Sequence, residues 1–317
     1  MTAQKIEGLE SLDQDTIEAL IEAGYNSIQS IAIALSSDLV IDIGVSEVIA
    51  EEIIGKAISS VTNPPLTAAD LLKMEQARGK VTTSSNSLDG LLKGGPWVAE
   101  ITEISGGFAT GKSQLCFQLS VNAQLDLSYG GLGGKVFFVD TEGTFSATRV
   151  GEMALAKDLD PHEILSNIYV VRVLDSKHQT QIVQQINDLA KKENIRLVVI
   201  DSIAAHFRTD YIGPNKIAER QQKIMQHASS LTKLAYVHDL AVVVTNQIVA
   251  KLDKISGGSE IQPALGEAWS HRPQTRIILR KSTGEARIAR LSDSPRHPEA
   301  EVVFYITDKG IRDKPKS

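Results

Sequence analysis

The segment from Gly106 to Ser113 carries the residue types that bind a nucleotide phosphate. It fits the pattern G-x-x-x-x-G-K-[ST], follows an apolar, strand-like run and opens a helical pattern from Leu115 to Ala123. Glycines let backbone N–H groups converge on phosphate oxygens, Lys112 supplies a charge for the β- and γ-phosphates, and the Ser113 hydroxyl is a ligand for Mg²⁺. A plain glycine turn is the simpler interpretation, but the flanking strand and helix stand where phosphate binding requires them. The residues expected to hold the nucleotide are Gly106, Gly107, Phe108, Ala109, Thr110, Gly111, Lys112, Ser113 and Gln114.

Two acidic residues and an amide stand at the ends of other strand-like runs. Asp201 ends an apolar run and would emerge at the same sheet edge as the glycine loop, where it can hold water on Mg²⁺. Glu142 lies just beyond a second run, where a carboxylate can orient or deprotonate an attacking water. Gln247 follows a third run and could sense the γ-phosphate through its amide. Acids and amides also form ordinary turns, so a purely structural interpretation stays open for each of the three.

Short apolar runs separated by helical patterns must position these residues. Runs without polar alternation are typical of strands buried on both faces of a mostly parallel sheet. Three later runs alternate more and are separated by turn residues, which predicts antiparallel hairpins that complete the sheet. The predicted fold class is α/β. The expected strands are 101–105, 135–140, 168–173, 197–201 and 241–246 in the parallel part, and 275–280, 286–291 and 301–306 in the hairpins.

Composition and charge narrow the class of protein. A chain of 317 residues with 42% hydrophobic and 23% charged residues is typical of a globular protein with one large and one small domain. A single cysteine, Cys116, excludes an intrachain disulfide framework. The chain has no apolar run of membrane-spanning length and no secretion-signal pattern at its start, so we expect a cytoplasmic protein without membrane contact.

The first 62 residues differ from the rest of the chain in charge and pattern. They contain two basic and eleven acidic residues, a balance of −9, whereas the whole chain carries −6. Short amphipathic helical segments break at Gly24 and Gly44, and two prolines between Asn63 and Leu66 indicate a linker. We therefore predict an all-α domain over 1–62, a linker over 63–80 and a larger α/β core over 81–317.

Further motifs extend the pattern around the glycine loop. They are found in the order 139–145 (VDTEGTF), 199–202 (VIDS), 206–213 (HFRTDYIG), 218–223 (AERQQK), 244–247 (VTNQ) and 293–295 (DSP). Together they resemble the RecA-like DNA strand-exchange ATPases, and in particular the archaeal RadA recombinases. The resemblance spans nearly the whole chain. It includes 42–47 (DIGVSE), which resembles a helix-hairpin-helix unit.

The resemblance implies a RecA-like core that uses ATP and Mg²⁺ to form a filament, or a ring without DNA, with ATP between protomers. Such a filament would assemble on single-stranded DNA and pair it with a homologous duplex. Lys112, Glu142 and Gln247 would be the catalytic residues, with Ser113 and Asp201 at the metal. The resemblance also implies that Arg149 contacts adenine, that Asp293 and Pro295 cap the neighbouring protomer's nucleotide, and that His271 links the nucleotide to a DNA loop.

Two segments are candidates for the DNA contact, because cations follow the phosphates and aromatic rings stack on bases without regard to sequence. The first lies within 206–223 and contains Arg208, Tyr211, Lys216 and Arg220, and the second lies within 251–262 and contains Lys251 and Lys254. Either segment could instead be a solvated loop. The acidic N-terminal lobe opposes tight DNA binding, so we expect it to guide duplex DNA weakly or to dock partners such as recombination mediators.

Several positions depart from the family pattern. Leu66 to Ala69 stands where the family places a phenylalanine plug, so Leu66 and Ala69 would form a smaller protomer contact. Pro214 and Asn215 replace a cationic segment, and Glu267 adds a negative charge beside the second loop. These departures keep open a recombinase paralogue that binds ATP and regulates without strand exchange. A small-molecule kinase with the same loop would be a third class, although no acceptor-pocket motif is visible.

Overall fold

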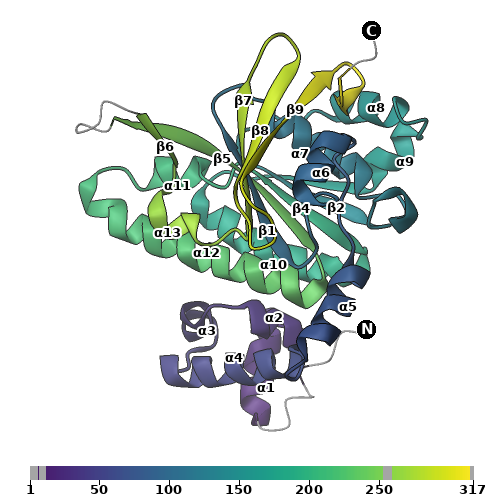
Figure 1. The fold of residues 1–317 in the computed structure, drawn as a ribbon. Coiled ribbons are helices and arrows are strands. Elements are labelled where there is room, and N and C mark those ends of the chain that lie inside the picture. The colour runs from purple at the N-terminus through teal and green to yellow at the C-terminus, as the bar shows by residue number, and fades with distance from the viewer. Residues whose placement is uncertain (1–5, 7–11, 253–258, 315–317) are drawn as a thin grey trace.

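The core of the structure is a large, mostly parallel sheet with helices on both faces (Figure 1). This computed structural model describes residues 6, 12–252 and 259–314. The described strands follow the order β10–β9–β8–β7–β1–β5–β4–β2–β3, and β6 pairs with β5 outside this order. Their bounds are β1 (Glu100–Gly106), β2 (Lys135–Asp140), β3 (Ile168–Arg172), β4 (Ile195–Asp201), β5 (Ala241–Leu252), β6 (Ser259–Pro263), β7 (Thr275–Lys281), β8 (Ala286–Asp293), β9 (Ala300–Thr307) and β10 (Gly310–Arg312).

The predicted α/β class and the eight predicted strands are confirmed. Strands β1, β2, β3, β4, β5 and β7 run parallel, and β8, β9 and β10 add antiparallel hairpins. Sequence analysis placed β7 only in a hairpin, whereas it also pairs in parallel with β1. It missed β10, which is too short to show a pattern, and β6, which pairs with an extension of β5.

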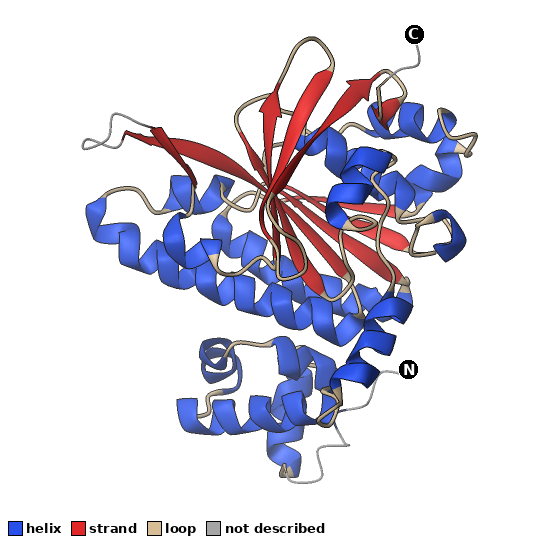
Figure 2. Cartoon of the chain, viewed as in Figure 1, coloured by secondary structure: helices blue, strands red, loops and turns tan. Residues whose placement is uncertain are grey.

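Two layers of helices explain why the central strands are continuous apolar runs. One hydrophobic cluster joins α6–α9 to one face of the sheet, and another joins α10–α13 to the opposite face. Figure 2 shows the blue helices on both sides of the red strands. Strands buried on both faces need no polar alternation. Among the described residues, no helix is both long and apolar enough to span a membrane. The helices of the core are α6 (Asn86–Leu92), α7 (Lys112–Asn122), α8 (Ala147–Leu155), α9 (Pro161–Ser166), α10 (Ser176–Lys192), α11 (Ala205–Asp210), α12 (Ile217–His238) and α13 (Gly266–Ser270).

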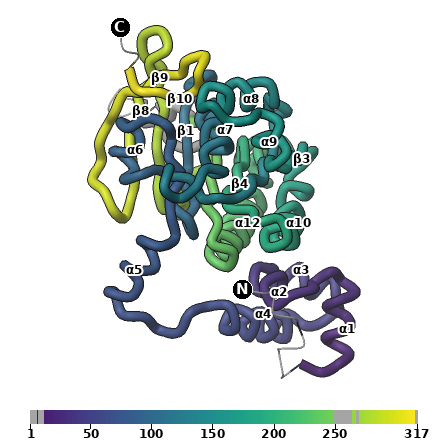
Figure 3. The backbone as a smooth tube through the Cα atoms, turned by 90° about the vertical axis from the view of Figure 1, so that its right-hand side faces the viewer, coloured from purple at the N-terminus to yellow at the C-terminus, as the bar shows by residue number. Residues whose placement is uncertain are grey.

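The N-terminal helices pack around a hydrophobic core of their own. They are α1 (Gln14–Glu22), α2 (Ile28–Ile33), α3 (Ser36–Ile43) and α4 (Glu47–Val61). Figure 3 shows them as a separate layer below α10 and α12. Gly44 ends α3 with a φ of 71°, and the Ser46 side chain caps α4, so the predicted break and hairpin are present.

Val45, Val48, Ile49 and Ile53 stand at helical spacing in the sequence, which predicts one apolar stripe on this hairpin, and that prediction is wrong in part. Ile53 is buried and Val45 is half-buried against the N-terminal core. Val48 and Ile49, in contrast, are exposed, because α4 turns Ala50, Ile53, Ile54 and Ala57 toward the core instead.

The segment between the two parts contains a helix that was not predicted, α5 (Ala68–Arg78). The Thr67 hydroxyl caps it by accepting a hydrogen bond from the Asp70 N–H at 3.2 Å. Within its described range, α5 has no buried side chain. Its C-terminal half is held by polar contacts, including an ion pair between Arg78 and Asp239 at 2.9 Å. The predicted division at 62/63 and 80/81 stays a prediction.

Candidate nucleotide and nucleic-acid site

The loop between β1 and α7 has a backbone that requires glycine at two predicted positions. Gly111 caps α7 with a left-handed φ of 102°, and a Cβ there would lie 2.1 Å from Ile306 Cδ1. At Gly106, a Cβ would lie 2.7 Å from the Leu279 carbonyl oxygen. The resulting loop faces the N-terminus of α7, where backbone N–H groups and the helix dipole attract an anion. Phe108, within this loop, is 94% exposed.

Lys112 is the first residue of α7, and its ammonium group bends back over the loop. Nζ donates hydrogen bonds to the carbonyl oxygens of Gly106 at 3.0 Å and Gly107 at 2.9 Å. Burial lowers the pKa of Lys112, and the carboxylates of Asp201 and Glu142 partly offset that effect. The lysine therefore lies where a phosphate can replace the two carbonyl contacts.

Asp201, the last residue of β4, is buried beside the same loop. The Thr245 hydroxyl donates a hydrogen bond to its Oδ1 atom. Burial raises the pKa of Asp201, and the hydroxyls of Ser113 and Thr245 partly offset that effect. Its Oδ2 atom has no hydrogen-bond partner among the described residues. A buried carboxylate oxygen without a partner, next to a hydroxyl, suits a hydrated divalent cation. Ser113 and Asp201 thus fit Mg²⁺. Thr245 belongs to the polar strand end that includes Gln247, but its contact with Asp201 was not predicted.

Glu142 lies in the loop that follows β2, and the buried Asp140 shapes that loop. The Asp140 carboxylate accepts hydrogen bonds from the N–H groups of residues 143–145, at 2.7, 3.0 and 3.2 Å. The exposed Glu142 carboxylate accepts a hydrogen bond from Ser202 Oγ at 3.0 Å. Because Ser202 directly follows Asp201, the predicted base and the predicted metal ligand are held together. Sequence analysis assigned no role to Asp140 or Ser202, although both belong to quoted motifs.

Gln247 lies next to the glycine loop, because β1 and β5 are parallel neighbours with Gly106 opposite Gln247. Its side-chain oxygen accepts a hydrogen bond from Arg208 Nη1 at 3.0 Å. Its carbonyl oxygen accepts one from the Ala264 N–H at 2.9 Å. The side-chain amide therefore connects the nucleotide edge to the first predicted DNA segment, and the backbone of Gln247 bonds to the chain two residues after the second segment.

Arg149 lies in α8 near the start of α7. Its Nε atom donates to the Gln114 side chain at 2.9 Å, and Nη2 donates to the Thr307 carbonyl at 2.5 Å. Nη1 also pairs with Glu152 at 3.1 Å. These contacts hold the guanidinium at the end of the glycine loop beside Gln114, another predicted nucleotide contact.

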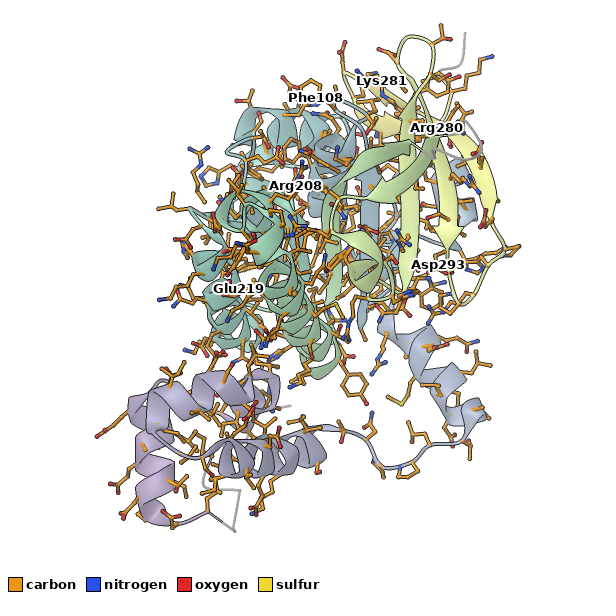
Figure 4. All side chains as sticks on the ribbon, turned by 90° about the vertical axis from the view of Figure 1, so that its left-hand side faces the viewer. Phe108, Arg208, Glu219, Arg280, Lys281 and Asp293 are labelled. Carbon is orange, nitrogen blue, oxygen red and sulfur yellow. The ribbon has the colours of Figure 1, made fainter. Side chains whose placement is uncertain are left out.

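The predicted cap lies two strands away from β1 and toward the other end of β7 from the glycine loop of the same chain. Asp293 ends β8 opposite Arg276, and Arg276 lies opposite Glu103, three residues before Gly106. With about 3.3 Å per residue and about 4.8 Å between strands, the backbone of Asp293 lies about 14 Å from Gly106. Figure 4 shows Phe108 and Asp293 well apart on the sheet. Asp293 and Pro295 therefore do not cap the nucleotide loop of their own chain.

The first predicted DNA segment is mostly helical, not a loop. It comprises α11, a 3-10 turn (Pro214–Lys216) and the start of α12. Arg208 is exposed, and Lys216 is exposed and paired with Glu219 at 2.5 Å. Tyr211 is half-buried, with its ring stacked on Phe207 at a centroid distance of 6.4 Å. The Nε atom of Arg220 is buried without a hydrogen-bond partner in the described part of the chain.

The second predicted DNA segment extends from a hairpin. Strands β5 and β6 are antiparallel, with Lys251 opposite Glu260, and they project beyond the helices (Figure 1). Lys254 lies outside the described residues. The alternative of a plain solvated loop over 251–262 does not hold for the parts that form β5 and β6.

The predicted protomer contacts are exposed on this chain. Leu66 is 43% exposed and Ala69 is exposed beside it, next to the exposed Leu71 and Leu72 of α5. His271, which follows α13, is also exposed. Because they are exposed, these residues are accessible to a second copy of the chain.

Sequence analysis missed a buried polar network below the nucleotide edge. Glu103 of β1 is fully buried and accepts hydrogen bonds from Asn246 Nδ2 at 2.7 Å and Trp269 Nε1 at 2.8 Å. Its second oxygen accepts one from Arg276 Nε at 2.8 Å. The network joins β1, β5, α13 and β7. The available signal was a charged residue within a strand expected to be buried on both faces.

Comparison with known proteins identifies the family. The Rad51 family model matches residues 76–314, three-quarters of the chain. The chain belongs to the Rad51 family. It is similar to proteins named DNA repair and recombination protein RadA from three archaea. The Metallosphaera sedula protein is 42% identical over 309 residues, 97% of this chain and 95% of the relative.

Two further RadA proteins show a similar identity to this chain. The Ignicoccus hospitalis protein is 43% identical and aligns with 96% of this chain and 94% of its own length. The Aeropyrum pernix protein is 42% identical and aligns with 97% of this chain and 96% of its own length. The predicted resemblance to RadA recombinases and the RecA-like core are confirmed.

Proposed function

We propose that this Rad51-family protein is an ATP-dependent DNA recombinase that assembles on single-stranded DNA and pairs it with a homologous duplex. Family membership supports recombination and ATP hydrolysis. The observation that carries the proposal is the convergence of Lys112, Ser113, Asp201, Glu142 and Gln247 at one sheet edge.

The phosphates of ATP would lie on the loop from Gly106 to Ser113, with Lys112 leaving its carbonyl contacts for the β- and γ-phosphates. Mg²⁺, held by Ser113 and through water by Asp201, would neutralise charge on the phosphate oxygens. Glu142 would orient the attacking water and accept its proton on a carboxylate oxygen. Ser202 keeps that carboxylate in place by its hydrogen bond at 3.0 Å.

The site would be completed by a neighbouring copy. Asp293 and Pro295 lie away from the glycine loop of their own chain, so the cap of one protomer would cover the nucleotide of the next. Leu66 and Ala69 would form the second part of the same contact. Because the site then binds ATP only in the assembled state, ATP would stabilise the filament, and its hydrolysis would release it.

Gln247 would report the γ-phosphate to the DNA surface. Its side-chain contact to Arg208 connects the nucleotide edge to the first predicted DNA segment, and its backbone carbonyl bonds to Ala264, two residues after the second. Arg208 and Lys216 are exposed and would contact phosphates. The exposed Ile41, Val48 and Ile49 of the N-terminal helices would dock a partner, such as a mediator protein or duplex DNA.

Turnover of ATP with and without single-stranded DNA tests the proposal. We expect DNA to stimulate hydrolysis, and electron microscopy with DNA and a nonhydrolysable ATP analogue to show filaments. A cytoplasmic site of action follows from the proposed substrate. Slow hydrolysis that DNA does not change would instead support a regulatory paralogue without strand exchange.

A further inference from the structure

Arg296 directly follows the predicted cap and joins it to the linker helix. Its Nη2 atom pairs with Glu75 of α5 at 3.1 Å, and Nη1 pairs with Glu100 at the start of β1 at 2.5 Å. Its Cζ atom lies 4.4 Å from the centroid of the Trp97 ring. One guanidinium thus contacts the linker, the sheet and an aromatic ring.

The surroundings hold this guanidinium in a defined orientation. The Lys80 ammonium lies 4.2 Å from the same Trp97 ring and donates a hydrogen bond to the Lys93 carbonyl at 2.8 Å. A planar guanidinium that stacks on a ring and binds two carboxylates loses little freedom per contact. Glu100 is more buried than Glu75, so we expect the contact with β1 to hold Arg296 in place. The contact with Glu75 then makes the orientation of Arg296 depend on where α5 lies.

The two structures joined by Arg296 are the two proposed halves of the protomer contact. On one side, Asp293 and Pro295 lie one to three residues away along the chain. On the other side, α5 begins two residues after Leu66. Figure 4 shows Asp293 directly above α5.

We propose that Arg296 is a positioning residue that sets the cap over the neighbouring protomer's nucleotide according to the placement of the linker helix. This inference rests on the proposed function. When Leu66 docks on a neighbour, α5 fixes Glu75, and Glu75 fixes Arg296 and the cap beside it. The docking of Leu66 on a neighbour is thereby coupled, within each copy, to the placement of its cap over a neighbour's nucleotide.

The test compares Glu75→Gln with a matched control, Glu299→Gln. Glu299 lies on the same hairpin, but its ion pair, at 2.5 Å, is with Arg290 of β8 and not with α5. With ATP and an oligo-dT strand, we expect Glu75→Gln to raise the ATP concentration for half-maximal hydrolysis about fivefold, or about 1 kcal/mol. The maximal rate and the control should change less than twofold. Arg296→Ala should have a larger effect, and Arg296→Lys should restore part of it.

A mixing experiment separates positioning from damage to the chain's own site. Arg296→Ala has an intact nucleotide loop and a misplaced cap, whereas Lys112→Ala has the reverse. If Arg296 acts on the neighbour, an equal mixture should hydrolyse ATP faster than the sum of the two variants alone. A mixture equal to that sum, or an unchanged ATP requirement in Glu75→Gln, would overturn the inference. If the parent protein shows no DNA-stimulated hydrolysis, the proposed function fails, and this inference fails with it.

Discussion

Replacing Glu103 by glutamine removes a buried negative charge and should lower the free energy of unfolding. Glu103 is fully buried, and its partner Arg276 is 13% exposed. Glutamine keeps the shape and one carbonyl oxygen, which can still accept from Asn246 and Trp269. Its amide nitrogen, however, would face the Nε–H of Arg276, so two donors would oppose each other and a buried cation would lose its counter-ion.

The expected cost follows from that geometry. Breaking a buried ion pair by removing one partner costs about 3–5 kcal/mol, because the remaining charge stays buried without compensation. Since Arg276 retains some solvent contact, we expect the lower end, about 3 kcal/mol. Arg276→Met should cost a similar amount. The double variant has neither charge buried alone, so its loss should fall short of the sum by about 2 kcal/mol.

Urea unfolding followed by tryptophan fluorescence measures these losses. The chain has two tryptophans, and a Trp97→Phe background leaves the emission of Trp269, whose indole donates to Glu103. The same variants therefore report stability and the local contact together. Additive losses in the double variant, or a loss below 1 kcal/mol in Glu103→Gln, would show that Glu103 and Arg276 do not act as a pair.

Three other predictions concern the site, the contact and acid stability. Glu142→Gln should bind ATP and keep filaments intact while hydrolysis falls about 100-fold, and a rate within tenfold of the parent would exclude Glu142 as the base. Leu66→Glu should prevent assembly in size-exclusion chromatography with ATP, whereas Leu72→Glu, on the helix α5 that follows Leu66, should not; equal assembly would remove Leu66 from the contact. Burial lowers the pKa of His227 to about 4 in the folded protein. Between pH 6.5 and 4 the unfolded chain therefore binds a proton at this histidine that the folded chain does not. The free energy of unfolding falls as the pH is lowered through that range. His227 alone should lower the free energy of unfolding, measured with urea, by about 2 kcal/mol between pH 7 and pH 5. A His227→Gln variant with the same pH dependence as the parent would contradict this prediction.

The nucleotide edge could be predicted from the sequence because its signals are local. The glycine loop lies within eight residues, and the residues Asp201, Glu142 and Gln247 each stand at the end of an apolar run. Parallel strands bring their carboxyl ends to one edge, so a correct strand assignment places these residues together without knowledge of strand order.

Features that depend on strand order and long-range pairing could not be predicted in this way. The network at Glu103 joins it to Arg276, 173 residues later in the chain, and requires β7 to lie beside β1. The helix α5 has no buried face, so hydrophobic periodicity gave no signal for it. The DNA segment at Arg208 was predicted as partly loop because its glycine and proline interrupt what are two helices and a turn.

The separation of the nucleotide loop and the proposed cap has a consequence for how the assembly works. If each copy offers a loop at one place and a cap at another, an open chain of copies always has one loop without a cap at its end. Hydrolysis per protomer should then rise with the length of the assembly and level off, because the uncapped end becomes a smaller fraction of all sites. A closed ring would have no such end and would show the full rate at any concentration that maintains it. The dependence of turnover on protein concentration therefore distinguishes an open filament from a ring. The distinction rests on the separation of Gly106 and Asp293 within one chain, because that separation leaves an end loop uncapped.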